Sequence, residues 1–128
     1  MKAKNYSRKR EAILAKIRST TVHPTAEWVY RELKDEIPDL SLGTVYRNIN
    51  LFRQEEQIAS VGIVAGQERF DGNVIPHGHF VCTHCHAVID FEAPPEQPEA
   101  ASQLEAQGFQ VNRIDLTAYG LCSQCLEA

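Results

Sequence analysis

The sequence predicts an α+β protein in two parts: an N-terminal winged helix-turn-helix domain, then a small α/β domain with antiparallel strands and a metal site. Three observations support this fold class. Apolar residues recur at helical spacing early in the chain, and an alternating stretch typical of a hairpin follows them. The second half contains two Cys-x-x-Cys pairs. The charge also changes sign, because residues 1–53 carry 11 Lys and Arg against 6 Asp and Glu, whereas residues 54–128 carry 2 against 11.

This charge asymmetry predicts that only the first half meets a polyanion, although two ordinary surfaces of unequal charge would give the same totals. No apolar run has the length of a membrane span, and the N-terminus lacks the apolar core of a signal peptide. We therefore expect a cytoplasmic protein with no membrane partner. In that compartment the four cysteines are expected to be metal ligands or redox groups before structural disulfides.

The first two helices are predicted from apolar stripes and capping residues. Ser7 to Ile17 is expected to form a helix with Ser7 as its N-cap. His23-Pro24 then precedes a second helix, for which Thr25 is the expected N-cap. The buried face of that helix follows the spacing i, i+3, i+4, i+7 and consists of Ala26, Val29, Tyr30 and Leu33.

A third helix is predicted from Ser41, its N-cap, to about Gln54. Its apolar stripe is Leu42, Val45, Ile49 and Phe52. The opposite face holds polar, non-acidic residues and one aromatic: Thr44, Tyr46, Arg47, Asn48, Asn50 and Arg53. Such a face can read bases in a DNA major groove, which makes Thr44, Tyr46, Arg47 and Asn48 candidate DNA-binding residues. The alternative is an ordinary solvated helix face.

A short hairpin is expected directly after this helix. Ile58 to Val64 alternates and is rich in β-branched residues, Ala65-Gly66 forms a turn, and Gln67 to Phe70 returns. Three helices followed by a hairpin make the winged variant of helix-turn-helix. We therefore place the first domain at residues 1–71, a hinge at about 71–76 and the second domain at residues 77–128.

The second domain is expected to contain three strands and one helix. The predicted strands are His77 to Val81, Ala87 to Phe91 and Phe109 to Tyr119. The predicted helix, Glu99 to Gln107, follows a proline-rich linker at residues 94–98 and is stopped by Gly108.

The cysteine spacing predicts one closed metal site. Cys82-x-x-Cys85 and Cys122-x-x-Cys125 are two knuckles of the kind that together hold tetrahedral zinc. Because so small a domain has little core, the ion would supply much of its folding free energy, on the order of 10 kcal/mol. A dithiol redox switch and an iron–sulfur cluster are the alternatives for these residues.

A second metal site is predicted from histidines and carboxylates. His77 and His79 leave one face of a strand, Asp90 lies on the returning strand, and Asp71 lies at the hinge. If His23 joins them from the linker between the first two helices, three nitrogens and two carboxylates form a set that suits Fe(II) or Mn(II). An ion bound there would span both domains and couple its occupancy to DNA affinity.

Each of these residues also has an ordinary interpretation. His23 before a proline is often a capping or surface residue, and the same ligand set with an open coordination position would suit a small metal-dependent enzyme. His84 and His86 have no evident partners in the sequence and are expected to be solvated.

Six motifs together resemble the ferric uptake regulator superfamily over nearly the whole chain, most of all its peroxide-responsive repressors. They are His23-Pro24-Thr25-Ala26, Ser41-Leu42-Gly43-Thr44-Val45-Tyr46-Arg47-Asn48, Arg69-Phe70-Asp71, His77-x-His79-x-x-Cys82-x-x-Cys85, Val88-Ile89-Asp90-Phe91 and Tyr119-Gly120-x-Cys122-x-x-Cys125.

The resemblance implies a homodimeric transcriptional repressor of double-stranded operator DNA, not an enzyme, in which the second domain dimerises. It implies one structural Zn(II) per subunit at the four cysteines. It also implies one regulatory Fe(II) or Mn(II) per subunit, held by His23, Asp71, His77, His79 and Asp90. In the peroxide branch hydrogen peroxide reacts at Fe(II), a ligand histidine is oxidised and the DNA is released; His23 and His77 match the oxidised positions.

Details of the match refine these expectations. Tyr46 and Arg47 match family positions that contact DNA, and an aspartate at position 90 favours peroxide sensing over iron sensing. An iron-, manganese- or zinc-responsive repressor without peroxide chemistry is the alternative. The chain departs from many relatives in having Gly78 between the two histidines and in starting late, which implies that it lacks an extra first helix.

Overall fold

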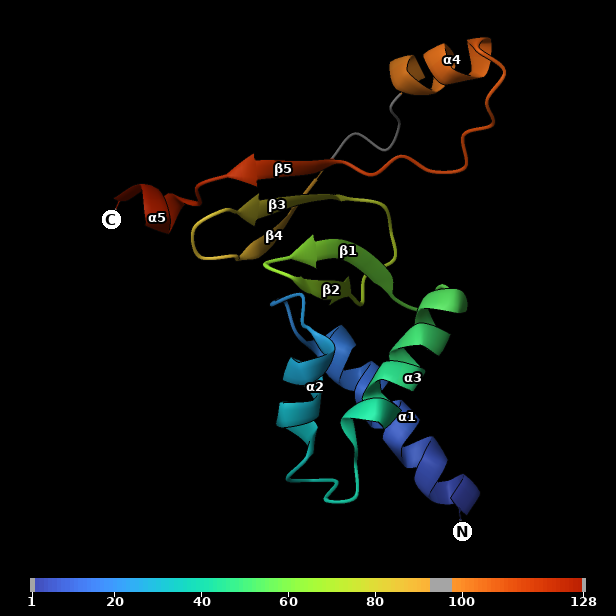
Figure 1. The fold of residues 1–128 in the computed structure, drawn as a ribbon, viewed down its shortest axis with the longest axis vertical. Helices are drawn as coiled ribbons and strands as arrows, with labels where there is room; N and C mark the ends of the chain where they lie inside the picture. Colours follow the sequence, from blue (N-terminus) through green and yellow to red (C-terminus); the bar gives the residue numbers. More distant parts are fainter. Residues whose placement is uncertain (1, 93–97, 128) are drawn as a thin grey trace. The chain divides into compact units, whose positions relative to one another are not determined.

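The computed structural model describes residues 2–92 and 98–127, so the predicted linker falls outside the described residues except for Pro98. The chain divides into two compact units, Met1–Val74 and Ile75–Ala128 (Figure 1). The helices and strands are mixed, as the α+β prediction requires. Within the described ranges, no helix has both the length and the apolar character needed to cross a membrane.

The first unit contains three helices and a hairpin. Its elements are α1 (Lys2–Ser19), α2 (Ala26–Leu33), α3 (Leu42–Gln54), β1 (Ala59–Val64) and β2 (Gln67–Asp71). Both expected inner caps are confirmed, because the hydroxyl of Thr25 accepts the Trp28 N–H and that of Ser41 accepts the Thr44 N–H. The expected start of α1 is wrong. Ser7 lies inside the helix, since the preceding residues contain no glycine or proline that would end it.

The core of the first unit is made by one apolar stripe from each helix. Val45, Ile49 and Phe52 of α3 are almost completely buried, as the helical spacing predicted. They form one cluster with residues of α1, α2 and the hairpin, which includes Ile13, Ile17, Val29, Leu33, Ile58 and Phe70. The cluster fixes which side of α3 faces solvent.

The hairpin after α3 is confirmed. β1 and β2 pair antiparallel from Ala59 with Asp71 to Val64 with Gln67. Ala65 and Gly66 between them both have positive φ, +52° and +82°, which is typical of the type I′ turns that suit the twist of a two-residue hairpin.

The second unit contains a three-stranded sheet and two helices. Its elements are β3 (Gly78–Cys82), β4 (Val88–Phe91), α4 (Pro98–Ala106), β5 (Thr117–Gly120) and α5 (Ser123–Glu127). The sheet order is β4-β3-β5; β3 pairs antiparallel with β4, as predicted, but parallel with β5. Gly108 has a φ of +92° just beyond α4, consistent with its predicted role as a helix stop.

Two features of this unit differ from the prediction. The strand expected over Phe109 to Tyr119 covers only β5, because strand pairing with β3 begins at Thr117 opposite His79. The last cysteine pair was not assigned to a helix, yet Cys125 lies on α5. The first difference depends on a strand partner that is distant in the sequence, whereas the backbone hydrogen bond from Leu126 to Cys122 in α5 is local.

Candidate metal centres and nucleic-acid interface

The four cysteine sulfur atoms converge in the second unit. The Sγ atoms of Cys82 and Cys125 lie 3.7 Å apart, and those of Cys85 and Cys122 lie 3.8 Å apart. All four atoms lie within 4.8 Å of one another. Four thiolates at Zn–S bond lengths around a tetrahedral ion are separated by about 3.8 Å, whereas a disulfide requires about 2.05 Å. The donor set and its spacing therefore fit zinc and exclude disulfides in this arrangement.

Backbone N–H groups prepare the cluster for negative charge. The Cys82 sulfur accepts the N–H of Cys85 at 3.4 Å and that of Cys122 at 3.5 Å. These hydrogen bonds lower the pKa of Cys82 to about 5, and the one from the Cys85 N–H has the largest effect. The pKa of Cys125 is raised to about 12, chiefly because its thiol shares a hydrogen bond with Cys122. A divalent cation bound by the four sulfur atoms would favour their thiolate form.

A histidine and a carboxylate meet in the first unit. His23 lies on the linker between α1 and α2, and Asp71 is the last residue of β2. His23 Nε2 lies 3.3 Å from Asp71 Oδ2, and both side chains are buried. We call these two residues the first arm.

Two histidines meet one carboxylate in the second unit. His77 Nε2 and His79 Nε2 lie 2.9 Å and 3.2 Å from the same oxygen, Asp90 Oδ1. The register of the sheet explains this meeting, because His79 pairs directly with Asp90 across β3 and β4. His77 Nδ1 lies 2.6 Å from the carbonyl oxygen of Ile75, a contact that would keep the proton on Nδ1 and leave the Nε2 lone pair for a metal. We call His77, His79 and Asp90 the second arm.

The glycine between those histidines has a packing role. A Cβ on Gly78 would lie 2.4 Å from Cζ of Phe91, its partner across β3 and β4. The ring of Phe91 therefore occupies the space that a side chain at position 78 would need. A glycine at position 78 is therefore matched to a phenylalanine at position 91 within the same pair of strands.

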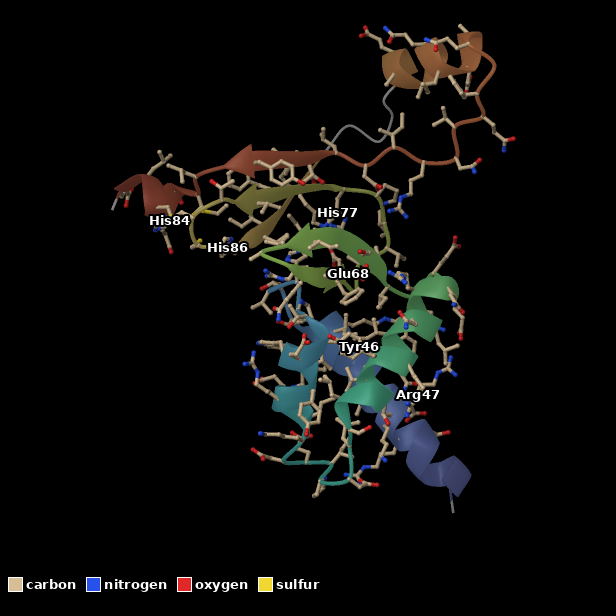
Figure 2. The ribbon with its side chains drawn as sticks, viewed as in Figure 1. Tyr46, Arg47, Glu68, His77, His84 and His86 are labelled. Atoms are coloured by element: carbon tan, nitrogen blue, oxygen red, sulfur yellow. The ribbon has the colours of Figure 1, made fainter. Side chains whose placement is uncertain are left out.

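The prediction that one face of α3 is exposed to solvent is correct for some of its residues and wrong for Asn48. Tyr46 and Arg47 are exposed and extend from α3 in different directions (Figure 2). Arg47 donates to Thr44 Oγ1 on the same helix at 3.0 Å. The expectation that Asn48 belongs to this face is wrong: Asn48 is 1% exposed, and its amide donates to the Thr44 carbonyl oxygen at 2.9 Å. Position 48 lies three residues after Val45 and shares its buried side.

Two carboxylates lie beside this face and were missed by sequence reasoning. The Tyr46 hydroxyl donates to Glu27 Oε1 on α2 at 2.6 Å, and this hydrogen bond raises the pKa of Tyr46. Glu68 on β2 binds Arg53 at 2.8 Å. Glu27, Glu68 and Tyr46 line one hollow of about 310 Å³. Because both acids come from other elements, the pattern of α3 alone held no signal for them.

A comparison with known protein families assigns the chain to one of them. The model of the ferric uptake regulator family matches residues 2–119. The chain belongs to the ferric uptake regulator family. Members of this family are metal-responsive transcriptional regulators that bind DNA, and they are not enzymes. This membership removes the small metal-dependent enzyme from consideration.

Relatives of the chain include a peroxide regulator and a ferric uptake regulator. The peroxide operon regulator of Bacillus subtilis is 31% identical over 116 residues, which cover 91% of this chain and 80% of that protein. The ferric uptake regulation protein of Campylobacter jejuni is also 31% identical, over 94% of this chain and 78% of that protein. The crystal structure of the Campylobacter jejuni peroxide stress regulator has a TM-score of 0.76 and 28% identity, covering 94% of this chain and 90% of that one.

Proposed function

We propose that the chain is a homodimeric repressor that binds double-stranded operator DNA when loaded with Fe(II) or Mn(II), and that releases it when peroxide oxidises a ligand histidine. The observation that carries the proposal is the convergence of two imidazole nitrogens on one carboxylate oxygen in the second arm. A second imidazole–carboxylate pair stands ready in the first arm. Relatives of both the peroxide-responsive and the ferric-uptake kind support the family part of the proposal.

The two arms have the chemistry of a single regulatory site. Together they offer three imidazole nitrogens and two carboxylates, a set that suits Fe(II) or Mn(II) better than thiolates would. We propose that both arms bind the same ion, with His23 and Asp71 supplied by the first unit. One ion would then restrict the orientation of the DNA-reading unit, which is how occupancy becomes DNA affinity. The zinc proposed for the four cysteines stays bound throughout and holds the fold.

The sensing step follows from the imidazole ligands. An Fe(II) ion held by these ligands would supply the one-electron reducing chemistry that cleaves the O–O bond of hydrogen peroxide. In the net reaction one oxygen atom of peroxide is transferred to an imidazole ring carbon of His23 or His77, and the other leaves as water. The oxidised ring has lost the basic nitrogen that a metal ligand requires. The ion therefore dissociates from the arm that contains the oxidised histidine. Asp90, whose side chain is 43% exposed, leaves the second arm accessible to peroxide.

We expect peroxide to release operator DNA from the Fe(II)-loaded protein but not from the Mn(II)-loaded protein, because Mn(II) does not readily supply that electron. Mass spectrometry of the Fe(II) sample should find a gain of about 16 Da, one oxygen atom, on His23 or His77. Operator binding would be followed by fluorescence anisotropy before and after peroxide. The Mn(II) sample, treated identically, is the matched control.

The same experiment addresses the alternative of a metal-responsive repressor without peroxide sensing, which the similarity to the ferric uptake regulation protein of Campylobacter jejuni favours. That alternative holds if the Fe(II) form stays on DNA and neither histidine gains mass. Metal removal alone should then control binding.

Homodimer formation is proposed for the second unit. Its core is small, and several large apolar side chains remain exposed: Ile89, Phe91, Phe109, Tyr119, Leu121 and Leu126. Burying such a surface against a second copy would stabilise both copies. A repressor with two copies of α3 would also match two halves of an operator.

Arg47→Ala is expected to weaken specific operator binding by about 1–3 kcal/mol if Arg47 contacts a base. Arg47 is exposed on α3 and its guanidinium donates to Thr44 on the same helix, a surface contact that it can exchange for one with DNA. Arg47→Lys is the matched control, because lysine keeps the charge but lacks the fork that recognises guanine. An unchanged preference among operator variants for both substitutions would make Arg47 a phosphate contact.

A further inference from the structure

Four consecutive residues at the end of the hairpin lie against the linker that holds His23 or against the end of α1, which precedes that linker. The Arg69 guanidinium donates from Nε to the His23 carbonyl oxygen and from its terminal nitrogen to the Val22 carbonyl oxygen, the latter at 2.6 Å. The next residue, Phe70, donates its N–H to the carbonyl oxygen of Pro24 at 3.0 Å. Asp71 then meets the His23 ring.

The fourth residue, Gly72, packs against α1. A Cβ on Gly72 would lie 2.7 Å from Cα of Arg18, so the chain after Asp71 runs in backbone contact with the last turn of α1. Because Arg69 and Phe70 also bind the residues on both sides of His23, the position of the linker is set by several contacts at once.

His23 adopts a backbone conformation that needs such support. Its φ is +55°, in the left-handed region that side chains other than glycine, asparagine and aspartate seldom occupy. Arg69 is the group that grips this segment, since a planar guanidinium offers two parallel donors to two successive carbonyl oxygens. Partial burial lowers the pKa of Arg69, and these two carbonyl contacts offset the loss of its water.

We propose that Arg69 is a positioning residue for the regulatory metal, holding the His23 backbone so that the imidazole faces Asp71 before the metal binds. This inference rests on the proposed function, in which His23 is a ligand. Without the guanidinium the linker relaxes toward right-handed φ values, and the imidazole turns away from Asp71. Metal binding then has to restore the strained conformation, and affinity falls.

The test is Arg69→Met in the full-length, zinc-containing protein, with Mn(II) alone as the probe in isothermal titration calorimetry. Methionine keeps an unbranched chain of similar reach but removes every donor. We expect the Mn(II) dissociation constant to rise about 10- to 100-fold, the range seen when residues that orient metal ligands are replaced. Zinc content and the circular dichroism of the metal-free protein should stay as in the wild type.

The matched control is Arg10→Met, which removes another tertiary arginine contact of the first unit, that of Arg10 with Glu55 at 2.9 Å. If the contacts of Arg69 are purely structural, like those of Arg10, both variants should unfold at a lower temperature and both should keep the wild-type affinity for Mn(II). That result would overturn the inference.

Two further variants separate the possible failures. If Arg69→Met does not fold, Arg69→Lys decides, because lysine retains one charged donor: a folded variant with an intermediate loss of affinity supports positioning. Wild-type affinity of this variant, or failure of both variants to fold, overturns it. His23→Ala tests the underlying proposal, since wild-type Mn(II) binding there would remove His23 from the site whatever Arg69 does.

Discussion

Cys122→Ser is expected to abolish zinc binding and to unfold the second unit. Cys122 contributes twice to the cluster: its sulfur lies 3.8 Å from that of Cys85, and its N–H bonds to the Cys82 sulfur. The hydrophobic core of this unit is thin, because Val81, Cys82 and Val88 are its buried apolar residues among those the structure describes. Structural zinc sites contribute on the order of 10 kcal/mol, more than such a core supplies, so the unit should not survive without the ion.

Elemental mass spectrometry measures the zinc content per chain, light scattering measures the molecular mass in solution, and circular dichroism measures the folded structure. We expect one zinc per chain in the wild type and close to none in the variant, together with loss of the dimer. His84→Ala is the control, because this exposed residue of the same knuckle should leave zinc in place (Figure 2). A folded, dimeric variant with full zinc would contradict a structural role for the cysteines.

The same zinc assay separates metal sensing from a thiol switch. Peroxide at a concentration that abolishes DNA binding should leave the zinc content unchanged if histidine oxidation carries the signal. Loss of zinc at that concentration would instead assign the signal to the cysteines.

His23→Ala is expected to abolish metal-dependent operator binding while zinc and the dimer remain. His23 is 3% exposed, and it is the imidazole that we propose the first unit offers to the metal. Removing a direct ligand should weaken Mn(II) binding by at least about 100-fold, because replacing a residue that only orients a ligand already lowers metal affinity by up to about 100-fold. Because coupling is reciprocal, operator DNA should raise the Mn(II) affinity of the wild type but not of the variant.

Calorimetry with Mn(II), with and without operator DNA, measures both effects. His86→Ala is the matched control, because it removes an exposed histidine outside the two arms (Figure 2). Operator binding by His23→Ala with the wild-type dependence on Mn(II) would show that the first arm takes no part in regulation. Loss of zinc from this variant would show that the two metal sites are not independent.

The sequence by itself determined the parts of this protein that depend on short spacings. Hydroxyl caps at Thr25 and Ser41 act within three residues, so the starts of α2 and α3 could be read directly. The Ala65-Gly66 turn and the alternation around it likewise specify the hairpin. The two Cys-x-x-Cys knuckles predicted a common site, because this spacing is typical of zinc ligands, and the four cysteines do cluster.

The tertiary structure decided the features that depend on distant partners. The Asn48 side chain is buried although the adjacent Arg47 is exposed, and Glu27 of α2 binds Tyr46 of α3. β5 is short and parallel because β3 pairs with it only from Thr117 onward. The contact of Arg69 with the His23 linker joins residues 46 positions apart. Such contacts arise when packing brings separate elements together, and no local periodicity encodes which atoms will then meet.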